Sequence, residues 1–384
     1  MKKFLILILL VFFIFPLLLF QPIYATTTAQ ASNTIKIGVI EPISGIYASG
    51  GQEEIRGVQI ANKLYPAVLG KKIELDIVDN MSDKTESSKA ASKLVSDKVC
   101  AVIGSWGSSL SIAAGTVFRN AKIPAVCATC TNPILTRQNV YYFRSCFADP
   151  YEGSVMAKYA FNTLKAKKVA IMVDSSNDFS VSLTNSFVDK MVKQTGDLDC
   201  VLEAAKYNVN DNSFSSQLLK IKAKNPDVIF IPGNYEESAR IIKEARSLGI
   251  KTQFLGDDLW QNNSFISIGG ASVEGVVFPT FFDEKKPLTD ESKKFITEYT
   301  KTYNQSPTFF AANAYDAYLM VINAIKNANS TDPTSIKNAL AKTTDMKGAT
   351  GYITIDINRD SIKDVPLLTV NNGAFVSKDT VKSK

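Results

Sequence analysis

The sequence contains no histidine among its 384 residues. Imidazole is the one side chain whose ordinary pKa lies near neutral pH, and Ser-His-Asp triads, Cys-His pairs and most catalytic zinc sites depend on it. The absence of histidine therefore excludes these mechanisms. We find no other nucleophile paired with a base, so we expect a protein without catalytic residues, without a metal site and without a cofactor.

Concentrated charge is also missing from the chain. The formal net charge is +6, and it falls to about +4 if Lys2 and Lys3 are removed with an N-terminal leader. No run of five or more like charges occurs anywhere. Binding to nucleic acid or to an anionic membrane surface usually requires such basic blocks. We therefore expect no nucleic-acid partner and no role at a membrane surface.

Cysteine is scarce, with five residues in the whole chain. Cys127 and Cys130 form a Cys-x-x-Cys in the stretch IPAVCATCTNP. A redox dithiol should open a helix after the first strand of a compact domain, and a zinc ribbon needs a second cysteine pair; neither context is present. A structural disulfide, with Cys146 near the pair, and burial as small apolar side chains both stay open. We expect the threonines of this loop, rather than the thiols, to carry function.

Residues 1–25 have the pattern of a secretory signal peptide. Lys2 and Lys3 precede an apolar run over 4–20, and a polar segment begins after Ala25. This order predicts cleavage near Ala25, although the run is long enough to act as an uncleaved anchor instead. No cysteine follows the run, so a lipid-modified N-terminus is not indicated. We expect an exported protein, periplasmic or extracellular, that is soluble after cleavage.

Short β-branched runs alternate with longer amphipathic segments after Thr34. This alternation predicts right-handed crossovers and parallel sheets. About 350 residues after the leader exceed one ordinary core, so we expect an α/β protein with two doubly wound lobes. The predicted strands are 35–40, 72–79, 100–105 and 123–126, followed by 168–174, 197–207, 227–233 and 252–258. The predicted helices are 52–64, 85–97, 109–121, 181–193, 214–224 and 236–248.

The last third of the chain predicts a more complex connection. A strand over 275–282 leads into helices over 290–303 and 309–328, and the segment 351–370 has the pattern of a closing hairpin. This order suits a chain that returns to the first lobe and ends on the second, with several crossovers acting as a hinge. The expected lobes are 34–147 plus 278–345 at the N-terminal side and 148–277 plus 346–384 at the C-terminal side.

The turn GSWGSS, over 104–109, joins a predicted strand to a predicted helix. The free N–H groups of the first helical turn, with Ser108 beside them, make this a candidate site for an anion or carboxylate. The alternative is that Ser108 only caps the helix. The loop with Thr129 and Thr131 occupies the same place one strand later.

Two adjacent carboxylates end a strand of the second lobe in FLGDDLW, over 254–260. Neighbouring residues on a strand face opposite sides, so we expect only one carboxylate to face the crevice. A lone carboxylate without a histidine partner suits an ammonium group better than acid-base catalysis. The alternative is that these carboxylates are ordinary acids on an exposed loop and bind no ligand. The stretch PGNYEES ends another strand and brings Asn234 and Tyr235 to the rim.

Several segments together carry a resemblance to a known family. They are the leader, IKIGVIEPISG, GSWGSS, TCTNP, SLGIKTQFLGDDLW and MKGATGYITIDINRD. Their order and spacing over 34–376 resemble the type I periplasmic substrate-binding proteins of branched-chain amino-acid ABC transporters. No single motif is specific, because each is short and tolerant.

The resemblance implies a set of ligand-binding residues. Ser108, Thr129 and Thr131 would hold the α-carboxylate and ammonium of an amino acid, and Asp258 would pair with the ammonium. Phe179, and Asn234 followed by Tyr235, stand where family members often have tyrosines, which leaves the side-chain preference open. The full set of expected ligand-binding residues is Trp106, Ser108, Thr129, Thr131, Phe179, Asn234, Tyr235 and Asp258.

The function that the resemblance implies is capture of a solute by lobe closure and delivery to an ABC importer. Its partners would be a small-molecule ligand, with an apolar amino acid favoured, and a membrane permease that recognises the closed monomer. Two alternatives remain open at this stage. The chain could be a ligand-sensing module for a receptor, or it could bind a small amide or carboxylate instead of an amino acid.

Overall fold

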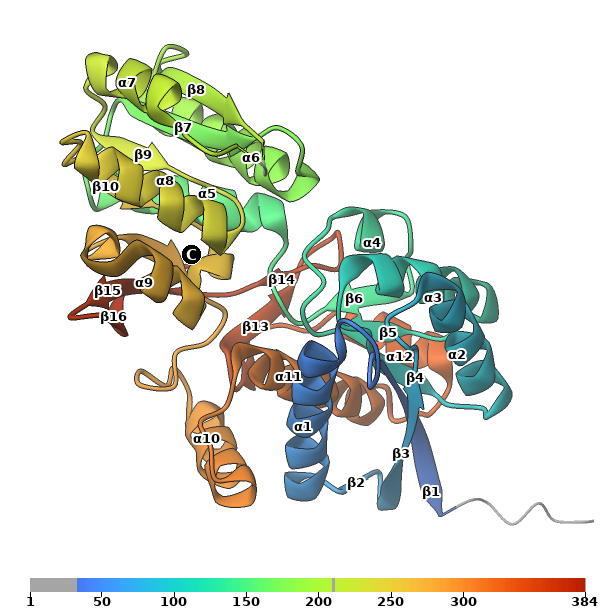
Figure 1. Cartoon of the computed structure of the whole chain (residues 1–384). Coiled ribbons are helices and arrows are strands. Elements are labelled where there is room, and N and C mark those ends of the chain that lie inside the picture. Colours follow the sequence, from blue (N-terminus) through green and yellow to red (C-terminus); the bar gives the residue numbers. More distant parts are fainter. Residues whose placement is uncertain (1–32, 209–210, 384) are drawn as a thin grey trace, which may run out of the picture. The chain divides into compact units, whose positions relative to one another are not determined.

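The computed structural model describes residues 33–208 and 211–383. The predicted leader, residues 1–25, lies outside the described residues, so its cleavage stays a prediction. None of the helices in the described part of the chain combines the length and apolar character needed to cross a membrane. The described residues from Thr34 onward form one compact unit that contains two large sheets (Figure 1).

The first sheet has six strands in the order β2-β3-β1-β4-β5-β6. All its pairings are parallel except that of β2 with β3, so the predicted crossovers of the first series are confirmed. The strands are β1 (Thr34–Glu41), β2 (Ala67–Val68), β3 (Lys71–Asp79), β4 (Ala101–Gly104), β5 (Ala125–Cys127) and β6 (Tyr142–Arg144). The helices between them are α1 (Ala48–Leu64), α2 (Lys84–Ser96), α3 (Ser108–Ala121) and α4 (Ile134–Arg137).

The second sheet has seven strands in the order β16-β15-β11-β10-β9-β7-β8. Its parallel part confirms the second predicted series, and the last two strands add an antiparallel edge. The strands are β7 (Val169–Asp174), β8 (Val201–Tyr207), β9 (Val228–Phe230), β10 (Gln253–Leu255), β11 (Val277–Pro279), β15 (Val365–Asn371) and β16 (Ala374–Val381). The helical segments are α5 (Asp149–Asn162), α6 (Asp178–Thr195), α7 (Ser215–Lys224), α8 (Tyr235–Ser247), η1 (Asp258–Trp260), α9 (Asn263–Gly269) and η2 (Gly270–Val273).

The chain returns to the first sheet after β11, as expected. Helices α10 (Asp290–Tyr303) and α11 (Phe309–Ala328) place their buried faces in the same core cluster as β1, and α12 (Pro333–Leu340) follows. Helix α11 packs tightly against α1 (Figure 1). A Cβ at Gly57 of α1 would lie 2.0 Å from the carbonyl oxygen of Ala311, so this approach requires glycine.

Buried polar residues bind the crossovers together. In the described residues the chain passes between the two sheets after β6, after β11 and before β15. The guanidinium of Arg144, at the first crossover, pairs with Asp360 at 2.7 Å. Nζ of Lys363, at the third crossover, donates to the Ser145 carbonyl at 2.8 Å and to Asn313 Oδ1 at 3.0 Å. A largely buried polar network therefore connects the first and third crossovers.

The predicted hairpin over 351–370 is confirmed only in its first part, because its second part pairs with a later strand. Its first part is β13 (Gly351–Ile355), which pairs with β12 (Met346–Gly348) and β14 (Ser361–Ile362) in a small third sheet. Its second part is β15, which forms the long hairpin with β16 instead. Asn372 and Gly373 have φ of 52° and 68°, which allows the tight turn between β15 and β16.

Candidate functional site

The turn between β4 and α3 carries the first group of predicted residues. Gly107 is the N-cap of α3, with φ of 83°, and the helix begins at Ser108. The alternative that Ser108 caps the helix is therefore wrong. Its Oγ accepts a hydrogen bond from the backbone N–H of Asn132 at 3.3 Å. This contact joins the GSWGSS turn to the loop of Thr129 and Thr131.

Two buried carboxyls that the sequence analysis overlooked lie behind these loops. Thr129 Oγ1 donates a hydrogen bond to Glu54 of α1. Oε2 of Glu41, the last residue of β1, accepts from the backbone N–H of Trp106 at 2.7 Å. Both acids are fully buried. The one available signal was an acid directly after the apolar run of the first strand.

Burial raises the pKa of both overlooked carboxyls. The pKa of Glu54 rises to about 7, although a hydrogen bond from Thr129 opposes the shift. The pKa of Glu41 rises well above its usual range because of burial and, next, because of the negative charge of Glu54. The carboxyls of Glu41 and Glu54 therefore tend to retain a proton near neutral pH.

Trp106 lies against the start of α1. Its ring centroid is 5.0 Å from that of Tyr47 and 6.2 Å from that of Phe310. A Cβ at Gly50 would lie 2.4 Å from the indole nitrogen, so the absence of a side chain at Gly50 makes room for the indole. Trp106 thus connects the predicted loops of the first lobe with the beginning of α11.

The adjacent acids after β10 are both buried, so the alternative of an exposed loop acid is wrong. Asp257 is 0% exposed and Asp258 is 7% exposed. Asp257 caps η1: its carboxyl oxygens accept from Leu259 N at 3.0 Å and from Gly233 N at 2.5 Å. The Asp257 carboxyl is therefore committed to the backbone.

Helix α5 connects Asp258 with Thr131. The backbone N–H of Asp258 donates to Oε1 of Glu152 at 2.9 Å, and the backbone N–H of Asp149 donates to the carbonyl of Thr131 at 3.1 Å. Asp149 and Glu152 both lie in the first turn of α5. The sequence analysis did not predict this helix, although proline after an acid, with another acid in the first turn, is a known start signal.

Burial, followed by the charges of neighbouring acids, raises the pKa of the carboxyls in this region. Burial raises the pKa of Asp258 to about 7; the adjacent Glu152 side chain opposes this rise, and the charge of Asp149 adds to it. Burial and then the charge of Asp258 raise the pKa of Glu152 and of Asp257 well above the usual range. Burial also raises the pKa of Asp149, while Thr131 and Arg144 oppose that shift. A cationic group would be strongly favoured here.

The remaining predicted residues begin two helices at the same edge of the second sheet. Asn234 precedes α8, and its Nδ2 donates to Glu237 at 2.7 Å. Tyr235 is the first residue of α8 and is partly exposed. Phe179, in the first turn of α6, packs beside the second core cluster. Gly233, next to Asn234, donates its backbone N–H to Asp257, so Asn234 borders the acidic group.

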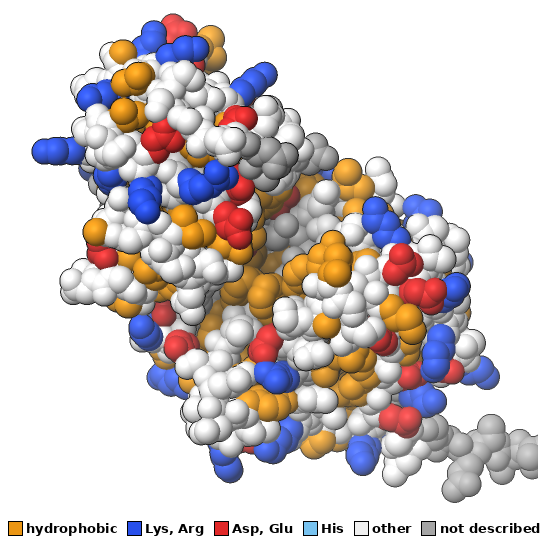
Figure 2. All heavy atoms as spheres, viewed as in Figure 1, with side chains coloured by type: hydrophobic (Ala, Val, Ile, Leu, Met, Phe, Trp, Pro, Cys, Tyr) orange, Lys and Arg blue, Asp and Glu red, His pale blue; other side chains and the backbone are white. Residues whose placement is uncertain are grey.

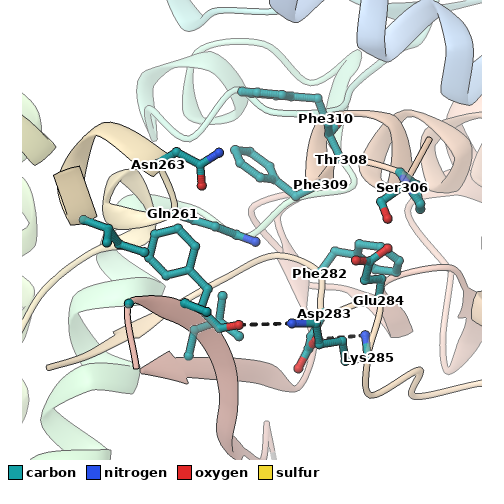
Figure 3. A pocket seen from close by; sticks show the side chains of 16 residues that line it. Gln261, Asn263, Phe282, Asp283, Glu284, Lys285, Ser306, Thr308, Phe309 and Phe310 are labelled. Atoms are coloured by element: carbon teal, nitrogen blue, oxygen red, sulfur yellow. Dashed lines mark hydrogen bonds between the residues drawn. The ribbon is translucent and has the colours of Figure 1, made fainter. Parts of the chain in front are cut away.

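A separate cavity of about 560 Å³ lies beside this site. Phe282, Phe309 and Phe310 line it, and Gln261 and Asn263 supply amide groups (Figure 3). None of the residues predicted from sequence lines it. Phe310 connects the two regions because its ring lies close to Trp106. No sequence motif indicates this cavity, because its walls come from segments far apart in the chain.

The five cysteines are all described, and all are buried and free. Cys130 Sγ lies 2.9 Å from the carbonyl oxygen of Ser105 and 2.9 Å from Ser111 Oγ. Cys127 Sγ lies 3.4 Å from the carbonyl of Phe143. Of the readings left open by the sequence, these contacts favour burial as packing residues over a disulfide.

Known proteins are similar to this chain in sequence and in fold. A family model described as "Periplasmic binding protein" matches residues 34–374. The Leu/Ile/Val-binding protein homolog 2 of Brucella abortus (strain 2308) is 28% identical over 330 residues, which cover 85% of this chain and 87% of that protein.

Two solved structures are also similar. The leucine binding protein LivK from Thermotoga maritima MSB8 is 36% identical, with a TM-score of 0.75 and coverage of 91% of this chain and 99% of that chain. The branched-chain amino acid transporter substrate binding protein LivJ from Streptococcus pneumoniae, in complex with isoleucine, is 31% identical, with a TM-score of 0.73 and the same coverage. The chain therefore belongs to the periplasmic binding protein family.

Proposed function

We propose that this protein is an exported solute-binding protein that captures an amino acid, with branched-chain and other apolar amino acids favoured, and delivers it to an ABC importer. The observation that carries the proposal is Asp258, a buried carboxyl in an acidic group at the end of β10. Such a site strongly favours an ammonium group. The relatives named as leucine-binding and as isoleucine-bound support the same ligand class.

The proposed ligand contacts divide between the two lobes. The N–H groups at the start of α3 and the hydroxyl of Ser108 would receive the α-carboxylate. Thr129 already donates its hydroxyl proton to Glu54, so toward the ligand it offers a lone pair, which suits the ammonium. Thr131 and Asp258 would complete the ammonium site. The side chain of the ligand would meet the residues bordering this site, Trp106, Phe179, Asn234 and Tyr235.

Delivery would follow from closure of the two lobes over the ligand. The proposed lobes are 34–147 plus 278–345 and 148–277 plus 346–384, and the crossovers bound by Arg144 and Lys363 would act as the hinge. A ligand that contacts both lobes stabilises the closed form more than the open form, and that difference drives closure. The permease would recognise the closed monomer after export and cleavage near Ala25.

Mixed surface charge fits a diffusing carrier. On the face shown in Figure 2, Lys and Arg side chains alternate with Asp and Glu side chains without one extended patch of either sign.

Mass spectrometry of the small molecule that co-purifies with the mature protein, released by denaturation, tests the proposal. We expect an apolar amino acid. A neutral amide, or a carboxylate without an amino group, would replace the proposal with the alternative ligand class.

A further inference from the structure

Two pairs of buried carboxyls each leave one oxygen per acid without a donor. Glu152 Oε2 and Asp258 Oδ1 have no hydrogen-bond partner, and neither do Glu41 Oε1 and Glu54 Oε2. The other oxygen of Glu152 accepts from Asp258 N, that of Glu54 from Thr129, and that of Glu41 from Trp106 N. A buried carboxylate oxygen without a donor is costly, so these four oxygens require an explanation.

A shared proton explains all four unpartnered oxygens. Glu152 lies against Asp258, because its Oε1 accepts from Asp258 N at 2.9 Å, and one carboxyl–carboxyl hydrogen bond in each interacting pair would give the unpartnered oxygens a partner. Two ionised carboxylates cannot form such a bond, because both can only accept. One carboxyl of each pair must therefore carry a proton that it donates to the other.

The charges around the Glu152–Asp258 pair favour retention of this proton. Asp149 faces the pair from the same turn of α5, and Asp257 faces it from the start of η1. Arg144 acts on Asp149, where it opposes part of the negative charge. The groups closest to the pair are thus acids, and ionising both members without a compensating cation would be strongly unfavourable.

We propose that Glu152 and Asp258 form one binding unit that holds a single proton between them in the ligand-free protein and releases it when a cationic group of the ligand binds. This rests on the proposed function, in which that group is the α-ammonium of an amino acid. The O–H bond of Glu152 breaks, the proton passes to solvent, and the N–H groups of the ligand donate to both carboxylates. Glu152 becomes a ligand-binding residue in its own right.

Ligand binding is expected to have the opposite effect on the Glu41–Glu54 pair, which keeps its proton. Glu41 accepts from the backbone N–H of Trp106 in the GSWGSS turn, beside the helix start where the ligand carboxylate is proposed to bind. A negative ligand group there stabilises the protonated form of the pair, so this second proton stays in place. Proton release on binding therefore comes from one pair only.

Calorimetric titration with L-leucine at pH 8, in two buffers of different ionisation enthalpy, counts the protons released. We expect about one proton per bound ligand in the wild type and about none in Glu152→Gln, whose amide can accept from Asp258 N and donate to Asp258 without a titratable proton. Affinity of the wild type should rise about tenfold per pH unit where one proton is released. Glu244→Gln is the matched control: Glu244 lies on α8, accepts from Ser213, Phe214 and Ser215, and should leave the proton count unchanged.

A ligand-free measurement separates this inference from the proposed function. Infrared spectra at pH 8 should show one more protonated carboxyl in the wild type than in Glu152→Gln. Equal spectra would overturn the shared proton, whatever the ligand. Leucine binding without proton release would overturn the release step and leave the proposed function standing. Failure of leucine and isoleucine to bind would count against the branched-chain assignment, while the infrared result would still decide whether the proton is shared.

Discussion

The backbone N–H of Asp149 donates to the carbonyl oxygen of Thr131 at 3.1 Å. This bond ties a loop that follows β5 of the first sheet to the first residue of α5, a helix that packs in the core of the second sheet. Through Glu152, in the same first turn, the helix reaches the backbone of Asp258. Helix α5, which neither sequence motif included, therefore connects Thr131 with Asp258.

The raised carboxyl pKa values predict an unusual pH dependence of stability. The pKa of Glu54 and of Asp258 is about 7 and that of Asp316 about 6, whereas the unfolded values are near 4. Between those limits the folded state binds more protons than the unfolded state, so stability is gained as pH falls from about 7 toward about 4. Urea denaturation of the ligand-free protein should give a free energy of unfolding about 1 to 3 kcal/mol larger at pH 5.5 than at pH 7.5.

This pH window is free of the usual competing groups. The chain has no histidine. Carboxyls with lowered pKa values, such as Asp79 and Glu244, lose their contribution only below the ordinary carboxyl range, as pH falls through their own folded pKa. Equal stability at both pH values, or a loss on acidification, would show that the buried acids do not take up protons.

Lys363 is expected to be essential for stability. Its ammonium donates to Ser145, Asn313 and Thr350, and burial lowers its pKa to about 8 while the charge of Asp316 opposes that shift. Lys363→Met would leave those acceptors unpaired and Asp316 uncompensated, so we expect a loss of about 3 to 5 kcal/mol in urea denaturation.

Lys382→Met is the matched control for this prediction. Lys382 pairs with Asp364 at 2.8 Å, but its side chain is 67% exposed. An exposed ion pair contributes little, so the loss should be below about 1 kcal/mol. If both lysine variants lower the free energy of unfolding by the same amount, the buried network around Lys363 does not stabilise the crossovers.

Cys127 and Cys130 should be dispensable for binding. Both are free, buried and packed against backbone carbonyls or hydroxyls. Replacing both by alanine should leave ligand affinity within a few-fold and lower the free energy of unfolding by about 1 to 4 kcal/mol, because small buried side chains are truncated. A dithiol-reductase activity that disappears in the double variant would instead establish a redox role.

Local patterns were sufficient to predict the long helices. The predicted ranges 290–303 and 309–328 match α10 and α11 as observed. Thr289 and Thr308 cap their N-termini, and Asn304 and Asn329 end them in the left-handed region. Each of these signals lies within a few residues of the helix end, so periodicity and capping residues define both bounds.

Non-local contacts explain what the sequence did not reveal. Glu41 and Glu54 look like ordinary acids in the sequence, and their burial depends on β1, α1 and the loop of Thr129 meeting in space. Strand β6 has only three residues, too few for a periodic signal. The pairing of β15 with β16, rather than with β13, depends on the neighbouring strand β11, which a reading of the segment 351–370 alone does not contain.

The most direct test of amino-acid binding compares Asp258→Asn with Asp257→Asn by calorimetric titration with the co-purified ligand. Asp258→Asn removes the charge that pairs with the ammonium and should weaken affinity about 30-fold to 1000-fold, or about 2 to 4 kcal/mol. Asp257→Asn alters a carboxyl committed to Leu259 N and Gly233 N, so it should lower stability by about 1 kcal/mol and leave affinity within about threefold. Equally small effects of both substitutions would contradict an ammonium at Asp258 and with it the proposal that the ligand is an amino acid.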